Sequence, residues 1–282
     1  MKNAQKRVMA IHDISGFGRC SLTVALPIIS AAGIEAVCLP TALLSTHTGG
    51  IDGFTYHDLT EDINPIFNHW RDLKINFDAV YSGFLGSFEQ IALVGKIFDH
   101  YRPLGSLIAV DPVMADNGVL YRVYSHEMAK GMATLCSHAD LIMPNFTEAC
   151  FILGKEYREP PYDEAYVKEL LCGLAKLGPK QIVLTGVCFE ESHLGAASFD
   201  VEEGVVRYSF TERINGLFHG TGDVFGSALV SAVLKGRSLE DATSIAANFT
   251  YESIKRTVAA GTDLRFGVNF EEGIADLSQI LK

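Results

Sequence analysis

The sequence predicts an α/β fold, a doubly wound and mostly parallel sheet flanked by helices, with an antiparallel hairpin at one edge. Short β-branched or apolar runs alternate with longer helical patterns from residue 8 to residue 184, as in parallel strands joined by right-handed crossovers. After that the alternation stops, and two strand patterns follow one another directly. With 282 residues and 48% hydrophobic content, the chain can bury a large core, and we expect one domain over residues 1–282.

The predicted elements follow in chain order. The strands are Val8–Ile11, Ala36–Leu39, Ala79–Tyr81, Leu107–Val110, Leu141–Met143 and Ile182–Leu184. The helices lie near 21–32, 60–72, 87–101, 125–136, 146–153 and 163–177. The hairpin pairs Gly195–Phe199 with Val205–Phe210 around Glu202-Glu203-Gly204. Two long helices end the chain, and Ser238 with Asp241 forms a capping-box-like start for the second.

One glycine-rich stretch does not fit a core element. Thr48-Gly49-Gly50-Ile51-Asp52-Gly53-Phe54 is too dense in glycine for a strand or helix. We therefore expect a short lid or flap near residues 47–58.

Charge and cysteine content limit the classes of partner. A formal net charge of −11 argues against a nucleic-acid or anionic-membrane surface, although a nucleotide could still bind in a local N–H pocket with Mg²⁺. The six cysteines form no Cys-x-x-Cys pair, which disfavours a zinc site or a disulfide framework and favours a reducing cytoplasm. The N-terminus has no signal-peptide pattern, and we expect no membrane span.

The most informative motif is Gly220-Thr221-Gly222-Asp223, which opens directly into an apolar run at 224–230. Two glycines spaced by one residue turn successive N–H groups toward one point, and the run predicts a buried helix whose N-terminus faces that point. Such a site attracts phosphate. Asp223 would repel the same anion unless it takes a proton from an attacking hydroxyl, so the motif indicates phosphoryl transfer to an alcohol. The alternative is a plain turn in which Asp223 caps the helix.

Polar residues follow most of the predicted parallel strands, where ligands bind in open sheets. They are His12, Asp13 and Ser15, then Ser82 and Gly83, Asp111, Asn145 and Glu148, and Thr185 with Gly186. Carboxylates, an amide and hydroxyls at one sheet edge suit Mg²⁺ and a polyphosphate. Two alternatives remain open, namely that Asp111 starts a turn before Pro112, and that Asn145 and Glu148 cap a helix.

Two other patterns are weaker. Gly16-Phe17-Gly18 follows a strand as in dinucleotide-binding proteins, but the third glycine and the acid that ends the second strand are missing. NAD binding is therefore disfavoured. His47 has no second His or Cys at ligand spacing, so zinc is disfavoured, whereas contact with a substrate stays open.

Six motifs together carry a family resemblance. They are Ser15-Gly16-Phe17-Gly18, Ser45-Thr46-His47-Thr48-Gly49, Ser82-Gly83-Phe84-Leu85-Gly86-Ser87, Asp111-Pro112-Val113-Met114-Ala115-Asp116, Pro144-Asn145-Phe146-Thr147-Glu148-Ala149 and Gly220-Thr221-Gly222-Asp223. In this order and spacing the chain resembles the pyridoxal kinases of the ribokinase superfamily. The resemblance implies ATP-dependent phosphorylation of the 5′-hydroxymethyl group of pyridoxal, pyridoxamine or pyridoxine, a step of vitamin B6 salvage. It also implies a cytoplasmic homodimer and leaves open a monovalent cation such as K⁺.

The resemblance supplies residue roles. Asp223 is the implied base, and Gly220, Thr221 and Gly222 form the implied anion hole. The implied nucleotide and Mg²⁺ side comprises Asp111, Glu148, Asn145, Thr185 and Gly186, with Asp111 and Glu148 organising the metal. The implied substrate side comprises Asp13, Ser15, His47, Thr48, Ser82 and Tyr121.

Three positions depart from the better-known family members. Asp13 replaces a serine, Phe84 a tyrosine and Ala115 a glycine. If position 115 requires a left-handed backbone, alanine costs roughly 1 kcal/mol there. Hydroxymethylpyrimidine kinases are the nearest alternative, because they share the fold and the catalytic aspartate and have a first turn similar to Asp13-Ile14-Ser15-Gly16. A non-catalytic ligand-binding protein on this fold is the third hypothesis.

Overall fold

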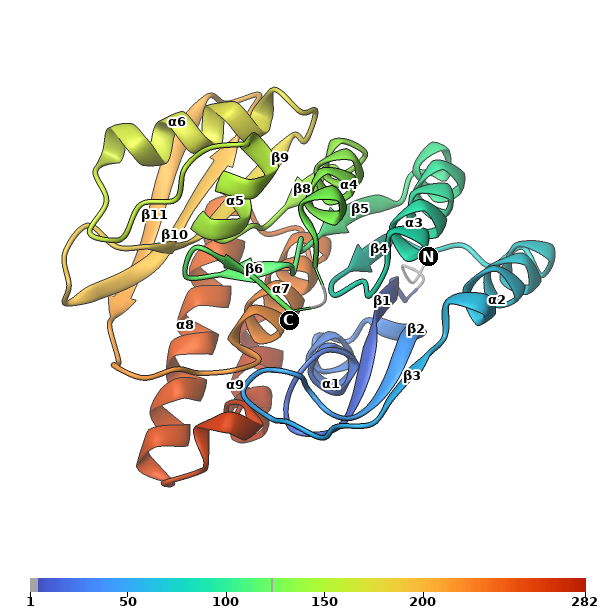
Figure 1. The fold of residues 1–282 in the computed structure, drawn as a ribbon, viewed down its shortest axis with the longest axis horizontal. Helices are drawn as coiled ribbons and strands as arrows, with labels where there is room; N and C mark the ends of the chain where they lie inside the picture. The colour runs from blue at the N-terminus through green and yellow to red at the C-terminus, as the bar shows by residue number, and fades with distance from the viewer. Residues whose placement is uncertain (1–4, 123) are drawn as a thin grey trace.

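The computed structural model describes residues 5–122 and 124–282. It contains a nine-stranded sheet in the order β11-β10-β9-β8-β5-β4-β1-β2-β3, and a separate pair β6-β7 (Figure 1). The pairs from β8–β9 to β1–β2 are parallel, whereas β9–β10, β10–β11 and β2–β3 are antiparallel. The predicted class of fold is therefore confirmed, including the edge hairpin.

The strands are β1 (Arg7–Phe17), β2 (Glu35–Thr46), β3 (Tyr56–Asp58), β4 (Ala79–Ser82), β5 (Leu107–Val110), β6 (Ala115–Asp116), β7 (Val119–Leu120), β8 (Leu141–Ile142), β9 (Gln181–Val187), β10 (His193–Asp200) and β11 (Val205–Glu212). The helices are α1 (Leu22–Ala31), α2 (Thr60–Asp72), α3 (Phe88–Tyr101), α4 (His126–Ser137), α5 (Phe146–Leu153), α6 (Glu164–Ala175), α7 (Thr221–Leu234), α8 (Leu239–Ala259) and α9 (Ile274–Ile280). Short 3-10 helices lie at Arg102–Leu104, Leu264–Phe266 and Glu271–Gly273.

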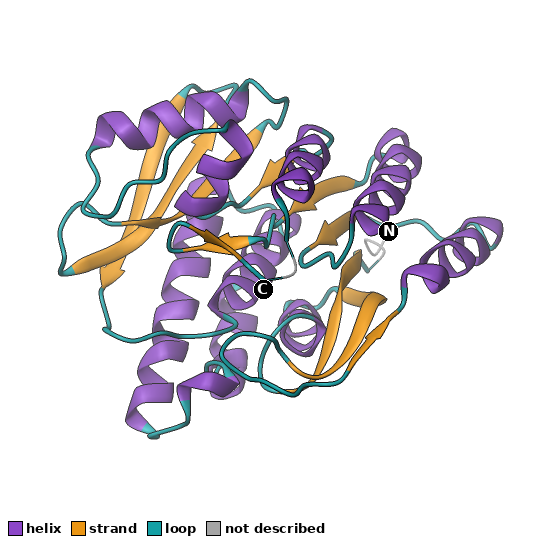
Figure 2. Cartoon of the chain, in the orientation of Figure 1, coloured by secondary structure: helices purple, strands orange, loops and turns teal. Residues whose placement is uncertain are grey.

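Helices cover both faces of the sheet (Figure 2). Alternate residues of β1 enter different cores, because successive side chains of a strand point to opposite faces. Val8 and Ala10 pack with α1, α7, α8 and α9, whereas Met9 and Ile11 pack with α2 to α6. This alternation determines which side of the sheet each polar residue at the end of β1 can reach.

Three features differ from the sequence prediction. β1 and β2 continue far beyond Ile11 and Leu39, and they pair as far as Phe17 with Thr46, with an irregularity between His12 and Ile14. The sequence pattern did not predict this extension, because a bulge in β1 interrupts the two-residue alternation of side chains. Part of the expected flap is strand β3, which pairs with β2. Gly16 lies inside β1, so the dinucleotide-like pattern does not form a strand-to-helix loop.

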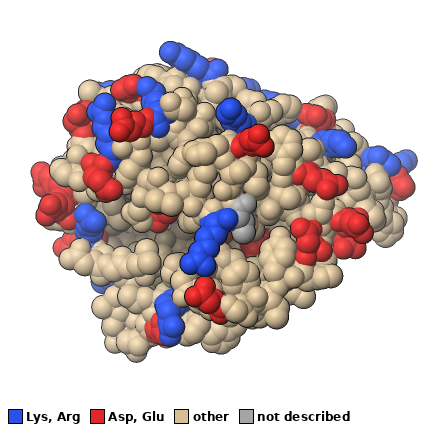
Figure 3. All heavy atoms as spheres, viewed as in Figure 1, with Lys and Arg blue, Asp and Glu red and all other residues tan. Residues whose placement is uncertain are grey.

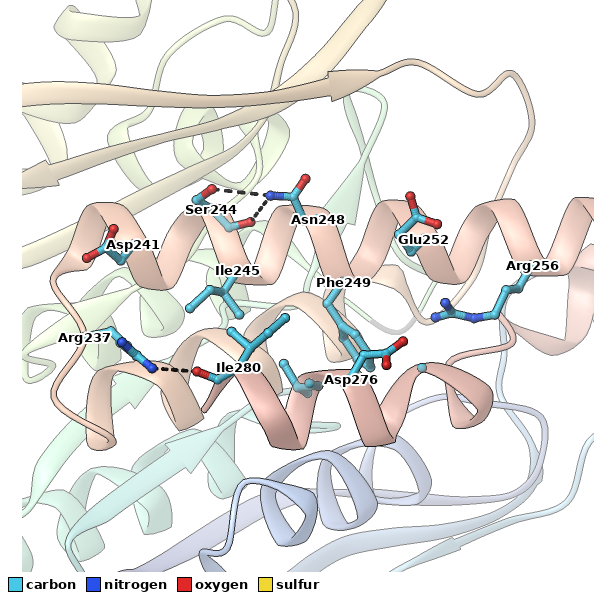
Figure 4. Close-up of a pocket in the computed structure, with 12 residues that line it drawn as sticks. Arg237, Asp241, Ser244, Ile245, Asn248, Phe249, Glu252, Arg256, Asp276 and Ile280 are labelled. Atoms are coloured by element: carbon cyan, nitrogen blue, oxygen red, sulfur yellow. Dashed lines mark hydrogen bonds between the residues drawn. The ribbon is translucent and has the colours of Figure 1, made fainter. Parts of the chain in front are cut away.

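Two further observations concern the surface. None of the described helices is long and apolar enough to span a membrane. A second hollow lies between α8 and α9, where Arg237 donates a 2.6 Å hydrogen bond to the carbonyl of Ile280 (Figure 4). It contains none of the catalytic, substrate-binding or nucleotide-binding residues predicted from the sequence.

Candidate active site

A pocket of about 620 Å³ opens at the carboxyl ends of the parallel strands, beside the first turn of α7. Its lining includes nearly all the site residues predicted from the sequence: Asp13, Ser15, His47, Thr48, Asp111, Tyr121, Asn145, Glu148, Thr185, Gly186, Gly220, Thr221, Gly222 and Asp223. Ser82 is the exception, because its side chain is fully buried and does not line the pocket. The sheet thus brings together residues from distant parts of the chain.

The first turn of α7 is built for close approach. Gly220 precedes the helix with φ 72°, and a Cβ there would lie 1.9 Å from the carbonyl oxygen of Arg19, so glycine is required for both reasons. No side chain caps this end of α7. The N–H groups of Thr221 and Gly222 therefore remain available for an anion from the pocket.

Asp223 lies in this same turn. Its Oδ2 accepts a 2.8 Å hydrogen bond from the backbone N–H of Ser21, at the start of α1. Burial raises the pKa of Asp223 to about 7, with a further contribution from Asp13, although the Ser21 N–H acts in the opposite direction. A carboxylate with a pKa near neutrality can take a proton and release it again at physiological pH. Because Asp223 accepts from α1 and leaves its own helix uncapped, the simple capping alternative does not describe it.

Asp13 is a second buried carboxyl group close to Asp223. Ser15 donates a 3.1 Å hydrogen bond to its Oδ2, and the hydroxyl of Ser21 donates to its Oδ1. Burial raises the pKa of Asp13, while these two hydroxyl donors lower it. The hydroxyls hold the carboxyl group in a fixed orientation at the pocket wall.

Asp111 and Glu148 form a further acidic pair in the lining of the pocket. Both are nearly inaccessible, and burial together with their mutual repulsion raises the pKa of Asp111. Glu148 and Asn145 form a capping box at the start of α5. The alternative that these two residues cap a helix is therefore confirmed for their local geometry. Glu148 also accepts a 3.1 Å hydrogen bond from the N–H of Met114. The pair lies close to the first turn of α7, because a Cβ on Gly222 would lie 3.8 Å from Asp111 Oδ2.

His47 reaches the pocket wall with both ring nitrogens already used. Its Nδ1 accepts a 3.1 Å hydrogen bond from the N–H of Gly49, and its Nε2 contacts the carbonyl of Arg265. It can therefore offer a substrate its ring rather than a free hydrogen-bonding atom. The ring of His219 lies 4.8 Å from that of His47, and Gly49 packs so closely on His219 that a Cβ would approach within 2.7 Å.

Two of the three unusual positions, Ala115 and Phe84, have simple structural consequences. Ala115 begins β6, and the left-handed residues of the following turn are Asn117 (φ 48°) and Gly118 (φ 77°). The condition for strain at Ala115 is therefore not met, because the positive φ angles fall two and three residues later. Phe84 lines the pocket and packs edge-on against Tyr124, with ring centroids 6.0 Å apart.

Sequence reasoning missed two lining or supporting residues. Arg213 is the only Lys or Arg among the described residues that line the pocket, against six carboxylates: Asp13, Asp111, Asp116, Glu148, Glu212 and Asp223. Its position after β11 gave no signal in a parallel-sheet argument. His12 was among the polar strand-end residues of the sequence analysis but was given no role there. It lies fully buried, and its Nδ1 is 3.9 Å from Oδ1 of Asp223.

On the face shown in Figure 3, acidic and basic side chains are interspersed over the surface.

A family model described as phosphomethylpyrimidine kinase matches residues 25–267. The chain belongs to this family. One relative is the hydroxymethylpyrimidine/phosphomethylpyrimidine kinase of Bacillus subtilis strain 168. It is 27% identical to this chain over 233 residues, which span 82% of this chain and 81% of the relative.

Solved structures extend the comparison to vitamin B6 kinases. A candidate phosphomethylpyrimidine kinase from Bacteroides thetaiotaomicron, crystallised with pyridoxal, is 36% identical with a TM-score of 0.92, covering 97% of this chain and 96% of its own. Pyridoxal kinase from Lactobacillus plantarum is 29% identical with a TM-score of 0.90, covering 98% and 97%. The resemblance to pyridoxal kinases of the ribokinase superfamily is therefore confirmed, and this family member has relatives of both substrate types.

Proposed function

We propose that the protein transfers the γ-phosphoryl group of ATP to the 5′-hydroxymethyl group of a vitamin B6 compound. The observation that carries this proposal is the position of Asp223, whose carboxyl group lies in the uncapped first turn of α7, lines the pocket and is 16% exposed there. A base and an anion site in one turn match the two needs of phosphoryl transfer to an alcohol.

In this proposal the substrate hydroxyl faces Asp223, and the phosphate of ATP faces the N–H groups of Thr221 and Gly222. Asp223 accepts the hydroxyl proton as the oxygen forms its bond to the γ-phosphorus and the bond to the ADP oxygen breaks. The N–H groups hold the charged phosphoryl oxygens, and Asp223 then releases the proton to solvent with the product.

The acidic pair fits a magnesium ion, although no cluster of three or more His, Cys, Asp or Glu among the described residues could hold a metal alone. Mg²⁺ typically binds one or two carboxylates and completes its shell with water and phosphate oxygens. Asp111 and Glu148 would hold it, with Glu148 acting through water because both its oxygens already accept backbone N–H groups. The ion would neutralise phosphate charge in a pocket whose lining, among the described residues, has one arginine and six carboxylates.

On the substrate side we assign Asp13, Ser15 and the ring of His47 to the wall of a slot for a flat heterocycle. Thr48 lies in the same wall, and the segment near residues 47–58 would act as its flap. Asn145 and Thr185, which pair with each other, and Gly186 also line the pocket, and we assign them to the nucleotide. The pyridoxal-bound relative supports the choice of a B6 compound.

A second candidate is hydroxymethylpyrimidine, which the family model and the Bacillus subtilis relative favour. A panel of pyridoxal, pyridoxamine, pyridoxine and hydroxymethylpyrimidine with Mg-ATP, measured as ADP release, tests the proposal. The highest kcat/KM on a B6 compound would support it. Faster turnover of hydroxymethylpyrimidine would instead select the second candidate, and ADP release with none of the four would reject both.

A further inference from the structure

His12 occupies an unusual place beneath the proposed base. It continues the alternation of Val8 and Ala10 along β1, so its ring enters the face of the sheet that α7 covers. Its side chain is completely inaccessible, and its ring lies edge-on to Tyr81 with centroids 4.6 Å apart. An apolar side chain would continue this core without any polar atom.

Neither ring nitrogen of His12 has a hydrogen-bond partner among the described residues. A buried donor without a partner costs roughly 1–3 kcal/mol, so packing alone does not explain a histidine here. Burial lowers the pKa of His12 to about 3, which leaves a neutral ring with one N–H to place.

Gly83 makes room for this ring. A Cβ on Gly83 would lie 2.2 Å from Nδ1 of His12 and 2.4 Å from Cε1. Gly83 is not among the residues with positive φ, so its backbone does not require glycine. The requirement is steric, and it concerns the side of the ring that carries Nδ1.

That same nitrogen faces Asp223. The Nδ1 atom lies 3.9 Å from Oδ1 of Asp223, while Oδ2 already accepts the N–H of Ser21. At 3.9 Å the contact is about 1 Å too long for a hydrogen bond. Hydrogen bonds of catalytic groups are often long without substrate and tighten in the bound complex.

We propose that His12 is a positioning residue that donates its Nδ1–H to Oδ1 of Asp223 when the substrates are bound. Together with the N–H of Ser21, it holds the carboxylate plane toward the attacking hydroxyl. The inference rests on the proposed role of Asp223 as the base. Asp223 thus has one donor from each of two elements, His12 on β1 and Ser21 at the start of α1.

Three variants test the donor. His12→Asn places an amide N–H near the position of Nδ1, His12→Gln places one near Nε2, and His12→Leu has none. We expect His12→Leu to lower kcat about tenfold or more while KM for ATP changes less than about twofold, because a hydrogen bond to a charged group is lost. His12→Asn should recover most of the loss, and His12→Gln should not. Recovery by Gln alone, or full kcat in a folded Leu variant, would overturn the proposal.

A spectroscopic measurement covers the case in which the variants do not fold. In the ¹⁵N-labelled full-length wild-type protein, the His12 signals should report the tautomer with the proton on Nδ1. The Nδ1–H resonance should move downfield on adding the alcohol with a non-hydrolysable ATP analogue, and the shift should be lost in Asp223→Asn. A proton on Nε2 would overturn the proposal. Absence of ADP release by the wild type with every alcohol would instead reject the proposed function, which the tautomer measurement does not depend on.

Discussion

Ser21 hydrogen-bonds to two carboxyl groups of the pocket, those of Asp223 and Asp13. Its backbone N–H donates to Asp223 over 2.8 Å, and its hydroxyl donates to Asp13. It does so at the start of α1 with φ 58°, a positive backbone angle that is uncommon for a residue with a side chain. The strained residue therefore connects the proposed base to the proposed substrate-binding acid.

Because the two bonds use different atoms of Ser21, they can be separated. Ser21→Ala removes the hydroxyl donor to Asp13 and keeps the N–H donor to Asp223. We expect KM for the alcohol to rise by up to about tenfold, with a smaller change in kcat. Ser15→Ala is the matched control, because Ser15 donates only to Asp13, over 3.1 Å. Steady-state kinetics should show the same pattern for both, and a loss confined to kcat in Ser21→Ala would contradict it.

Asp223→Asn should leave the fold and ATP affinity largely intact and lower kcat by roughly 10²–10⁴, the usual contribution of a positioned general base. The amide retains an oxygen for the Ser21 N–H but accepts no proton. Nucleotide binding by calorimetry and turnover by ADP release measure the two effects. Near-wild-type turnover would remove Asp223 from this role.

The pH dependence of the wild type gives an independent check of the same residue. A general base works when it is ionised, and burial raises the pKa of Asp223 to about 7. We therefore expect kcat/KM to rise with pH up to about 7 and then to level off. Asp13→Asn should move this rise to lower pH, because Asp13 contributes to the raised pKa of Asp223. A rise that stays in place in that variant would show that another group is responsible.

The sequence predicted the parallel sheet and the edge hairpin, and nearly all of the site residues that it singled out line the pocket, because strand ends and Gly-Thr-Gly-Asp carry local signals. It could not predict how residues on different elements combine. Ser21 lies 202 residues before Asp223 and has no motif of its own. The ring of His12 fits only because Gly83 has no side chain, and not because Gly83 adopts a special backbone conformation. Such relationships arise only from the three-dimensional packing of β1, β4 and α7.

The acidic pair gives a prediction on metal dependence. Asp111→Asn should raise the Mg²⁺ concentration for half-maximal rate by about tenfold or more, with a smaller change in KM for the alcohol. Asp72→Asn is a control of equal charge, because the side chain of Asp72 is 73% exposed at the end of α2 and does not line the pocket. An unchanged Mg²⁺ requirement would return Asp111 to the alternative of a turn before Pro112.

Without metal, the same pair should destabilise the folded protein at high pH. Burial raises the pKa of Asp111, and that of Glu148 to about 8, so the folded state without metal holds protons that the unfolded state releases near pH 4. Stability is then greatest at low pH and falls as pH rises through the folded-state values. In EDTA, Asp111→Asn should raise Tm at pH 8 more than at pH 5. Thermal unfolding at both values measures this, and a lower Tm at pH 8 would contradict it.

Substrate preference is the last prediction, and it depends on Asp13. Asp13 stands where the better-known pyridoxal kinases have a serine, which carries no charge. In this protein it is a buried carboxyl group that Ser15 and Ser21 hold in place by hydrogen bonds. A carboxylate can pair with the 4-aminomethyl group of pyridoxamine, and the aldehyde of pyridoxal carries no such cation. Asp13→Asn keeps the size and removes the charge. We expect it to lower kcat/KM for pyridoxamine more than for pyridoxal, by a factor equivalent to about 1–2 kcal/mol. Asp116→Asn, another acid of the same pocket, is the control and should lower both alike. If Asp13→Asn lowers both compounds equally, its charge does not select between them and the carboxyl group serves only to orient the wall of the slot.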